Sequence, residues 1–131
     1  MARVLLVEDQ TALRLVLSEL LREGGHEVLA AASGSCALGM LERRPPPDVV
    51  VMDLLMPKVG GRGVLAQMRA DPRWRALPVV LMTGADGNSD DFPPPGSYQA
   101  LLRKPFEVED LLAAVDACIA GPGGGQPSGP G

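Results

Sequence analysis

The stretch Val49-Val50-Val51-Met52-Asp53 decides the fold that we expect for this chain. Apolar residues that follow one another without polar alternation are typical of a strand buried on both faces, as in a parallel sheet. Two similar runs occur at Val4–Val7 and Val79–Met82, and weaker strand patterns at 27–31 and 100–103. The sequence therefore predicts five strands, of which three are buried on both faces.

Helical patterns separate these strands. The first has apolar residues at helical spacing and ends at Gly24-Gly25. The second is capped by Ser33 and ends before Pro45. The apolar positions of the four predicted helices are Leu13, Val16, Leu17, Leu20 and Leu21; Ala37, Leu38 and Leu41; Val64, Leu65 and Met68; Val108, Leu111, Leu112, Val115 and Ile119. Alternation of strand and helix predicts right-handed βαβ units, with helices on both faces of a parallel sheet.

One connection breaks this alternation. Between Thr83 and Ala100 a further helix is expected, but the segment contains Pro93-Pro94-Pro95. Proline cannot sit inside a helix, and the residue before each proline is driven out of the α region. At most one helical turn fits, at about 89–91, so this helix is predicted to be short or missing.

Length and composition limit what the chain can be. Its 131 residues, 46% of them hydrophobic, predict one domain over residues 1–120 that folds without a structural metal or disulfide. Residues 121–131, rich in Gly and Pro, predict a flexible tail. A net charge of −4 argues against binding of nucleic acid or a membrane surface. With no signal-peptide pattern and no apolar run of 18 residues, we expect a cytoplasmic protein.

Four less common residues have structural interpretations. Cys36 and Cys118 lack metal-type spacing and are predicted to be small buried side chains on helices. His26, at a strand start, is predicted to be a partly exposed structural histidine. Trp74 is predicted to pack in a loop against the third helix, although it could also anchor a partner.

Polar residues stand where the predicted strands end. Glu8 and Asp9 follow the first strand, Asp53 the third, Thr83 the fourth and Lys104 the fifth. A single acidic residue at a strand end is more often a helix cap than part of a binding site. In a parallel sheet, however, ligands bind at the carboxyl ends of the strands, and all five of these residues would meet at that edge. Two carboxylates about 4 Å apart repel by roughly 4 kcal/mol at an effective dielectric near 20. Lys104 and a Mg²⁺ ion would neutralise them, and a remaining carboxylate could accept a phosphoryl group.

The same motifs resemble the receiver domain of bacterial two-component response regulators. They are Val4–Asp9, Val51–Pro57, Gly61, Met82–Ala85 and Lys104-Pro105-Phe106, in family order and at family spacing. The resemblance implies a flavodoxin-like, doubly wound five-stranded parallel sheet of order 2-1-3-4-5. It also implies a domain that is not an enzyme acting on outside substrates.

The resemblance further implies a role for each matching residue. Asp53 would be the phosphoacceptor, Thr83 the hydroxyl that moves toward the phosphoryl group, and Lys104 its partner, in a peptide bond with Pro105 that is often cis. Mg²⁺ would be held by Asp53, Asp9, Glu8 through water, and the backbone carbonyl of Leu55. The implied partners are a sensor histidine kinase or phosphotransfer protein and an unknown downstream protein.

The chain departs from the family pattern in three places. Leu101 stands three positions before the lysine, where the family has an aromatic residue, and Tyr98 is three residues too early to replace it. The proline-rich segment 91–96 replaces most of the helix that the family has between its fourth and fifth strands, and Gly60 replaces an Asp or Asn. The first two affect the surface that reports phosphorylation. A degenerate receiver that binds its partner regardless of phosphate is therefore an alternative.

An enzyme of the haloacid-dehalogenase type is a further alternative, since it also uses an Asp nucleophile and Mg²⁺. Such enzymes need a second Asp two residues after the nucleophile, where this chain has Leu55. A nucleotide-binding module would need a glycine-rich phosphate loop after a strand, and the sequence has none.

Overall fold

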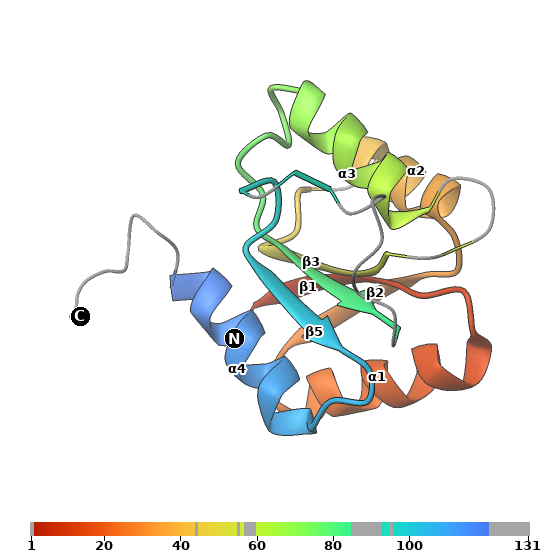
Figure 1. Ribbon diagram of the computed structural model, residues 1–131, viewed down its shortest axis with the longest axis vertical. Coiled ribbons are helices and arrows are strands. Elements are labelled where there is room, and N and C mark those ends of the chain that lie inside the picture. The colour runs from red at the N-terminus through yellow and green to blue at the C-terminus, as the bar shows by residue number, and fades with distance from the viewer. Residues whose placement is uncertain are drawn as a thin grey trace.

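The computed structural model describes residues 2–43, 45–54, 56, 60–84, 93–94 and 96–120. They form a parallel sheet of order β2-β1-β3-β4-β5, flanked by helices (Figure 1). The strands are β1 (Arg3–Val7), β2 (Glu27–Ala31), β3 (Val49–Asp53), β4 (Val79–Thr83) and β5 (Ala100–Arg103). The helices are α1 (Thr11–Glu23), α2 (Gly34–Arg43), α3 (Gly61–Ala70) and α4 (Val108–Ala120). The predicted fold class and strand order are confirmed.

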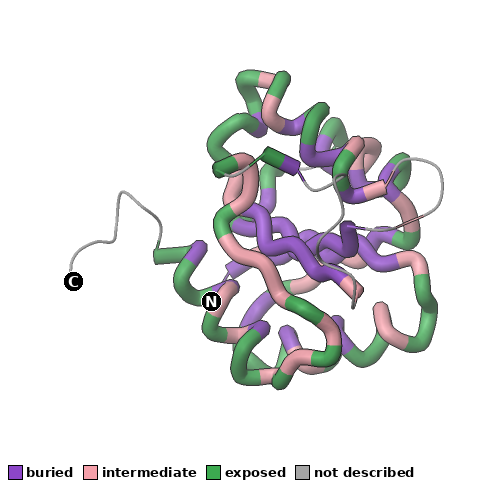
Figure 2. Tube along the Cα trace, viewed as in Figure 1, coloured by how far each residue is buried: buried purple, intermediate pink, exposed green. Residues whose placement is uncertain are grey.

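The sheet separates two hydrophobic cores. Helices α2 and α3 cover one face and α1 and α4 the other (Figure 1). Side chains alternate along each strand, so Val50 and Met52 of β3 enter the α2/α3 core while Val49 and Val51 enter the α1/α4 core. All of β3 and β4 is buried, as the central purple strands of Figure 2 show. This burial on both faces explains why the runs are continuously apolar.

The prediction for α1 was wrong at one position. Val16 is 53% exposed, whereas Ser18 is buried. Leu17 and Leu21 define the middle of the buried face. At roughly 100° per residue, Val16 lies about 120° from that middle and Ser18 only about 80°. In α4 the predicted core residue Ile119 is 37% exposed, and its neighbour Cys118 is buried instead.

The predictions for the two cysteines and the histidine were partly right. Cys36 is exposed on α2, contrary to prediction, because Ala37 and Leu41 take the buried face of that helix. Cys118 is buried as predicted, and burial raises the pKa of its thiol. His26 is buried rather than partly exposed, since α4 packs over it, with Asp116 Oδ1 3.5 Å from its Nε2.

The helix start at α2 and the packing of Trp74 follow the prediction. Ser33 Oγ accepts a hydrogen bond of 3.0 Å from the Cys36 N–H, which caps the helix. Trp74 is buried in the α2/α3 core, and the Arg73 guanidinium lies 4.2 Å from its ring centroid. Arg73 also hydrogen-bonds Asp71 at 2.7 Å, which lowers the pKa of that carboxyl to about 2.

The connection between β4 and β5 contains no helix in its described residues, 84, 93–94 and 96–99. The predicted turn at 89–91 lies outside the described residues, as does the predicted tail at 121–131. Arg69 of α3 holds the end of this connection, because its Nε donates to the Ser97 carbonyl at 2.7 Å. Its Nη1 donates to the carbonyl of Arg75, on the connection between α3 and β4, at 3.0 Å. Gln99 lies 3.4 Å from Arg69 Nη2 and accepts from the Val79 N–H at 2.7 Å.

Across the described ranges, no helix combines the length and the apolar character needed to cross a membrane.

Candidate functional site

The predicted site residues occupy one edge of the sheet, at the carboxyl ends of β1, β3, β4 and β5. Asp53 and Thr83 are the last residues of β3 and β4, Glu8 and Asp9 follow β1, and Lys104 follows β5. Because all strands are parallel, residues far apart in the sequence meet there.

Three carboxylates converge at this edge. Each of Glu8, Asp9 and Asp53 has an oxygen within 4.8 Å of an oxygen of the other two. Glu8 is fully buried, Asp53 is 6% exposed and Asp9 is half-buried. Such a concentration of negative charge in a poorly solvated place requires a cation or protonation.

Lys104 provides one cation. Its Nζ lies 2.7 Å from Asp53 Oδ2 and 3.6 Å from Glu8 Oε1. Burial works against the charged amine, but the hydrogen bond to Asp53 and the charges of Asp53 and Glu8 together raise the lysine pKa. The Lys104 N–H donates to the Thr83 carbonyl at 2.8 Å, and the Lys104–Pro105 peptide bond is cis, as the family resemblance implied.

Glu8 is held by its own backbone surroundings. Its Oε2 accepts from the Gln10 N–H at 3.0 Å, and Arg14 Nη1 donates to its carbonyl at 2.9 Å. Its buried Oε1 has no hydrogen-bond partner among the described residues. Burial, with a further contribution from Asp53, raises the pKa of Glu8 to about 7, against the lowering effects of the Gln10 N–H and Lys104.

Gln10 and Arg14 were missed by the sequence reasoning. The available signal was their position, at the start of the helix that follows an acidic strand end. From there, a backbone N–H and a long basic side chain can return to Glu8.

Gly61 is present because α3 begins directly against the end of β3. A Cβ atom there would lie 2.3 Å from the Asp53 carbonyl oxygen and 2.8 Å from Leu54 Cα. The Gly61 N–H donates to the Leu54 carbonyl at 3.0 Å. The missing side chain therefore allows the backbone contact that positions the peptide following Asp53.

The donor set fits Mg²⁺. Carboxylate oxygens are the hard ligands that this ion prefers, and the buried Glu8 Oε1, which accepts no hydrogen bond from the described residues, is an acceptor that a hydrated cation would satisfy. Thr83 is buried on the strand next to β3, where Asp53 is in register with Met82. The predicted ligand carbonyl of Leu55 lies outside the described residues.

Comparison with known families identifies this arrangement. Residues 4–116 match the response regulator receiver domain. The chain belongs to this family. Receiver domains are signalling modules of two-component systems, they interact with histidine kinases or phosphotransfer proteins, and they bind Mg²⁺ in the active site.

Relatives of this receiver differ in length. Protein PilH of Pseudomonas aeruginosa is 36% identical over 124 residues, with 92% of this chain and 100% of PilH covered. Response regulator protein FleR of the same species is 41% identical over 116 residues, with 87% of this chain but only 24% of FleR covered. The DNA-binding dual master transcriptional regulator RpaA of Synechocystis is 31% identical, with 91% of this chain and 49% of RpaA covered. The receiver thus spans all of one relative and half or less of the other two.

Solved structures share the receiver fold. A putative response regulator from Chloroflexus aurantiacus has a TM-score of 0.83 and 29% identity, with 91% of this chain and 98% of that chain covered. The receiver domain of the sensor histidine kinase PA1611 from Pseudomonas aeruginosa has a TM-score of 0.82 and 27% identity, with the same coverage. That structure has a magnesium ion coordinated in the active site cleft.

Proposed function

We propose that this receiver accepts a phosphoryl group on Asp53 from a histidine kinase or phosphotransfer protein and signals through contact with a downstream protein. The observation that carries the proposal is the contact of 2.7 Å between Lys104 Nζ and Asp53 Oδ2 inside a cluster of three carboxylates. The pair places a nucleophilic oxygen and a fixed positive charge at the same point. A cytoplasmic location belongs to the same proposal, since the kinases that would supply the phosphoryl group act there.

The proposed transfer needs little covalent chemistry from the protein. An Asp53 carboxylate oxygen forms a bond to phosphorus as the bond from phosphorus to the donor's imidazole nitrogen breaks, and the nitrogen keeps the electron pair. Lys104, whose Nζ donates to Asp53 Oδ2, would pair with the phosphoryl oxygens, and the Thr83 hydroxyl would donate a hydrogen bond to them. A bound Mg²⁺ would offset negative charge at the acidic cluster. Glu8, Asp9, Asp53 and the Leu55 carbonyl are the proposed ligands.

The readout of this receiver should differ from that of its relatives. Leu101 packs against the α2/α3 core where the family has an aromatic residue, and Tyr98 packs against the same core. Arg69 ties the carbonyl of Ser97 to α3. We therefore assign the conformational response to the segment that leads into β5, residues 96–99, instead of a helix between β4 and β5.

Intact-mass analysis after incubation with acetyl phosphate and Mg²⁺ tests the proposal. We expect the wild-type chain to gain one phosphoryl group, and we expect no gain without Mg²⁺ or in Asp53→Asn. Asp48→Asn is the matched control, because Asp48 precedes the same strand but lies at its opposite end, and it should be phosphorylated normally. Absence of phosphorylation in the wild type would contradict the proposal.

A second measurement separates this function from a receiver that acts without phosphate. If the chain is a switch, Asp53→Asn should lose signalling in the host. Full signalling by Asp53→Asn would show that the chain is a phosphorylation-independent interaction domain.

A further inference from the structure

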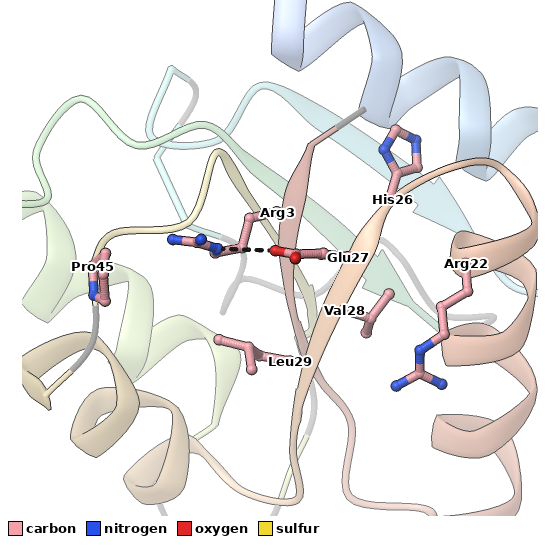
Figure 3. A pocket seen from close by; sticks show the side chains of 7 residues that line it. All are labelled: Arg3, Arg22, His26, Glu27, Val28, Leu29 and Pro45. Atoms are coloured by element: carbon pink, nitrogen blue, oxygen red, sulfur yellow. Dashed lines mark hydrogen bonds and ion pairs between the residues drawn. The ribbon is translucent and has the colours of Figure 1, made fainter.

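A groove runs along the outer edge of the sheet, at the end of the molecule opposite the acidic site. It has a volume of about 650 Å³ and includes Arg3, Arg22, Val28, Leu29 and Pro45 in its lining (Figure 3). Arg3 and Glu27 are the first residues of β1 and β2, whereas the acidic site lies where the strands end. The groove is therefore separate from the residues proposed to handle the phosphoryl group.

The main chain of β2 has one open side. In the described part of the sheet, β2 pairs with β1 and with no other strand. Glu27 donates to the Ala2 carbonyl at 2.8 Å, and the Ala31 carbonyl accepts from Glu8 at 3.0 Å, so the odd-numbered residues of β2 bond to β1. Since the direction alternates along a strand, the N–H and C=O groups of Val28 and Ala30 face the open edge.

The side chains of the groove lie on both sides of this edge. Figure 3 shows Val28 pointing to the side where Arg22 of α1 lies and Leu29 pointing to the opposite side, toward Pro45. Both apolar side chains are only half-buried. A strand added beside β2 would place its own alternating side chains over Val28 on one face and Leu29 on the other.

The charges that line the groove indicate which kind of added strand would bind there. Glu27 is already paired with Arg3, whose Nε lies 3.3 Å from its Oε1. The Arg22 guanidinium, by contrast, has no hydrogen bond or ion pair with any residue in the described ranges. The unpaired charge of the groove is thus positive, on a chain whose net charge is −4. Pairing this edge with the same edge of a second copy would bring together two grooves that each carry the Arg22 charge, and two chains that each have a net charge of −4, so an acidic segment of another protein complements the groove better.

From this combination we infer that the β2 edge binds an extended acidic segment of a partner protein as an additional strand. The backbone groups of Val28 and Ala30 provide the hydrogen bonds, Val28 and Leu29 the apolar contacts, and Arg22 the preference for carboxylates. This docking site acts independently of phosphorylation at Asp53.

A labelled model peptide, acetyl-Val-Glu-Val-Glu-Val-amide, tests this inference on the full chain by NMR titration. We expect amide shifts concentrated at 27–31, and at least about tenfold weaker binding in Ala30→Pro. Proline at this position blocks the open edge while leaving the bonds to β1 intact. Arg22→Glu should weaken binding about threefold or more, whereas Arg75→Glu, an exposed arginine on the α3–β4 connection, should not.

Three outcomes would overturn the inference. The first is equal binding of the corresponding Val-Lys peptide, which would remove the role of Arg22. The second is a set of shifts centred outside β2. The third is a concentration-dependent dimer without peptide that Ala30→Pro abolishes, which would assign the edge to self-association. If Ala30→Pro fails to fold, Arg22→Glu and Arg75→Glu decide the matter alone.

Discussion

Lys104 Nζ lies 2.7 Å from Asp53 Oδ2 and joins the ends of two strands that are separated in the sheet by β4. The lysine is the positive charge closest to a cluster of three carboxylates, among the contacts of the described residues. It therefore both stabilises the acidic site and repels a divalent cation that enters it.

Lys104→Gln should increase the affinity for Mg²⁺. Removing a positive charge a few Å from the ion lowers the repulsion, and we expect binding at least about tenfold tighter at pH 8. Isothermal titration calorimetry measures the change, with Arg103→Gln, an exposed neighbour on β5, as the control. Weaker Mg²⁺ binding in Lys104→Gln would show that the lysine orders the carboxylates more than it repels the metal.

Glu8→Gln should stabilise the metal-free protein at high pH. Because burial raises the pKa of Glu8 from 4.5 in the unfolded chain to about 7, the folded state holds a proton that the unfolded state has lost between these values. The free energy of unfolding of the wild type therefore falls as pH rises from about 4.5 to 7. We expect Glu8→Gln to gain roughly 1–3 kcal/mol at pH 8 and little at pH 4.5.

Urea denaturation in the presence of a chelator at both pH values checks this expectation. Glu19→Gln on the exposed face of α1 is the control and should change nothing. A destabilised Glu8→Gln at pH 8 would mean that the carboxylate is better compensated than its burial indicates.

Gly61→Ala should destabilise the protein by roughly 1–3 kcal/mol, because the added Cβ would overlap the Asp53 carbonyl and the backbone must move. Gly39→Ala is a matched control, since its Cβ would approach only the flexible end of Arg43 within a helix. That variant should be neutral or up to about 1 kcal/mol more stable. Thermal denaturation of both proteins tests the difference, and equal stabilities would argue against a tight contact at Gly61.

Arg69→Met should loosen the segment that enters β5. The guanidinium donates to the carbonyls of Ser97 and Arg75 and approaches Gln99, so its loss should cost roughly 2–4 kcal/mol. Amide hydrogen exchange should accelerate at 97–101 and remain unchanged in α1. Arg75→Met, which keeps the backbone carbonyl that Arg69 bonds, should have little effect. Similar exchange rates at 97–101 in both variants would contradict the role of the Arg69 guanidinium in holding this segment.

The sequence alone determined the strands, their parallel arrangement and the residues of the acidic edge. Continuous apolar runs such as 49–52 are stable when both faces of the strand are buried between two layers of helices. In a parallel sheet, the residues that follow these runs then lie at the same edge. The resemblance of these motifs to receivers supplied the strand order, which the structure confirms.

Only the tertiary structure decided how far each side chain is buried and what it contacts. Helical spacing could not distinguish Val16 from Ser18 at the margin of α1, because the outcome depends on how the helix is rotated against the sheet. Likewise, Gly61 contacts the Asp53 backbone and Arg69 bonds the Ser97 carbonyl, and no local sequence pattern encodes either contact. Packing sets these distances, and packing is a property of the whole fold.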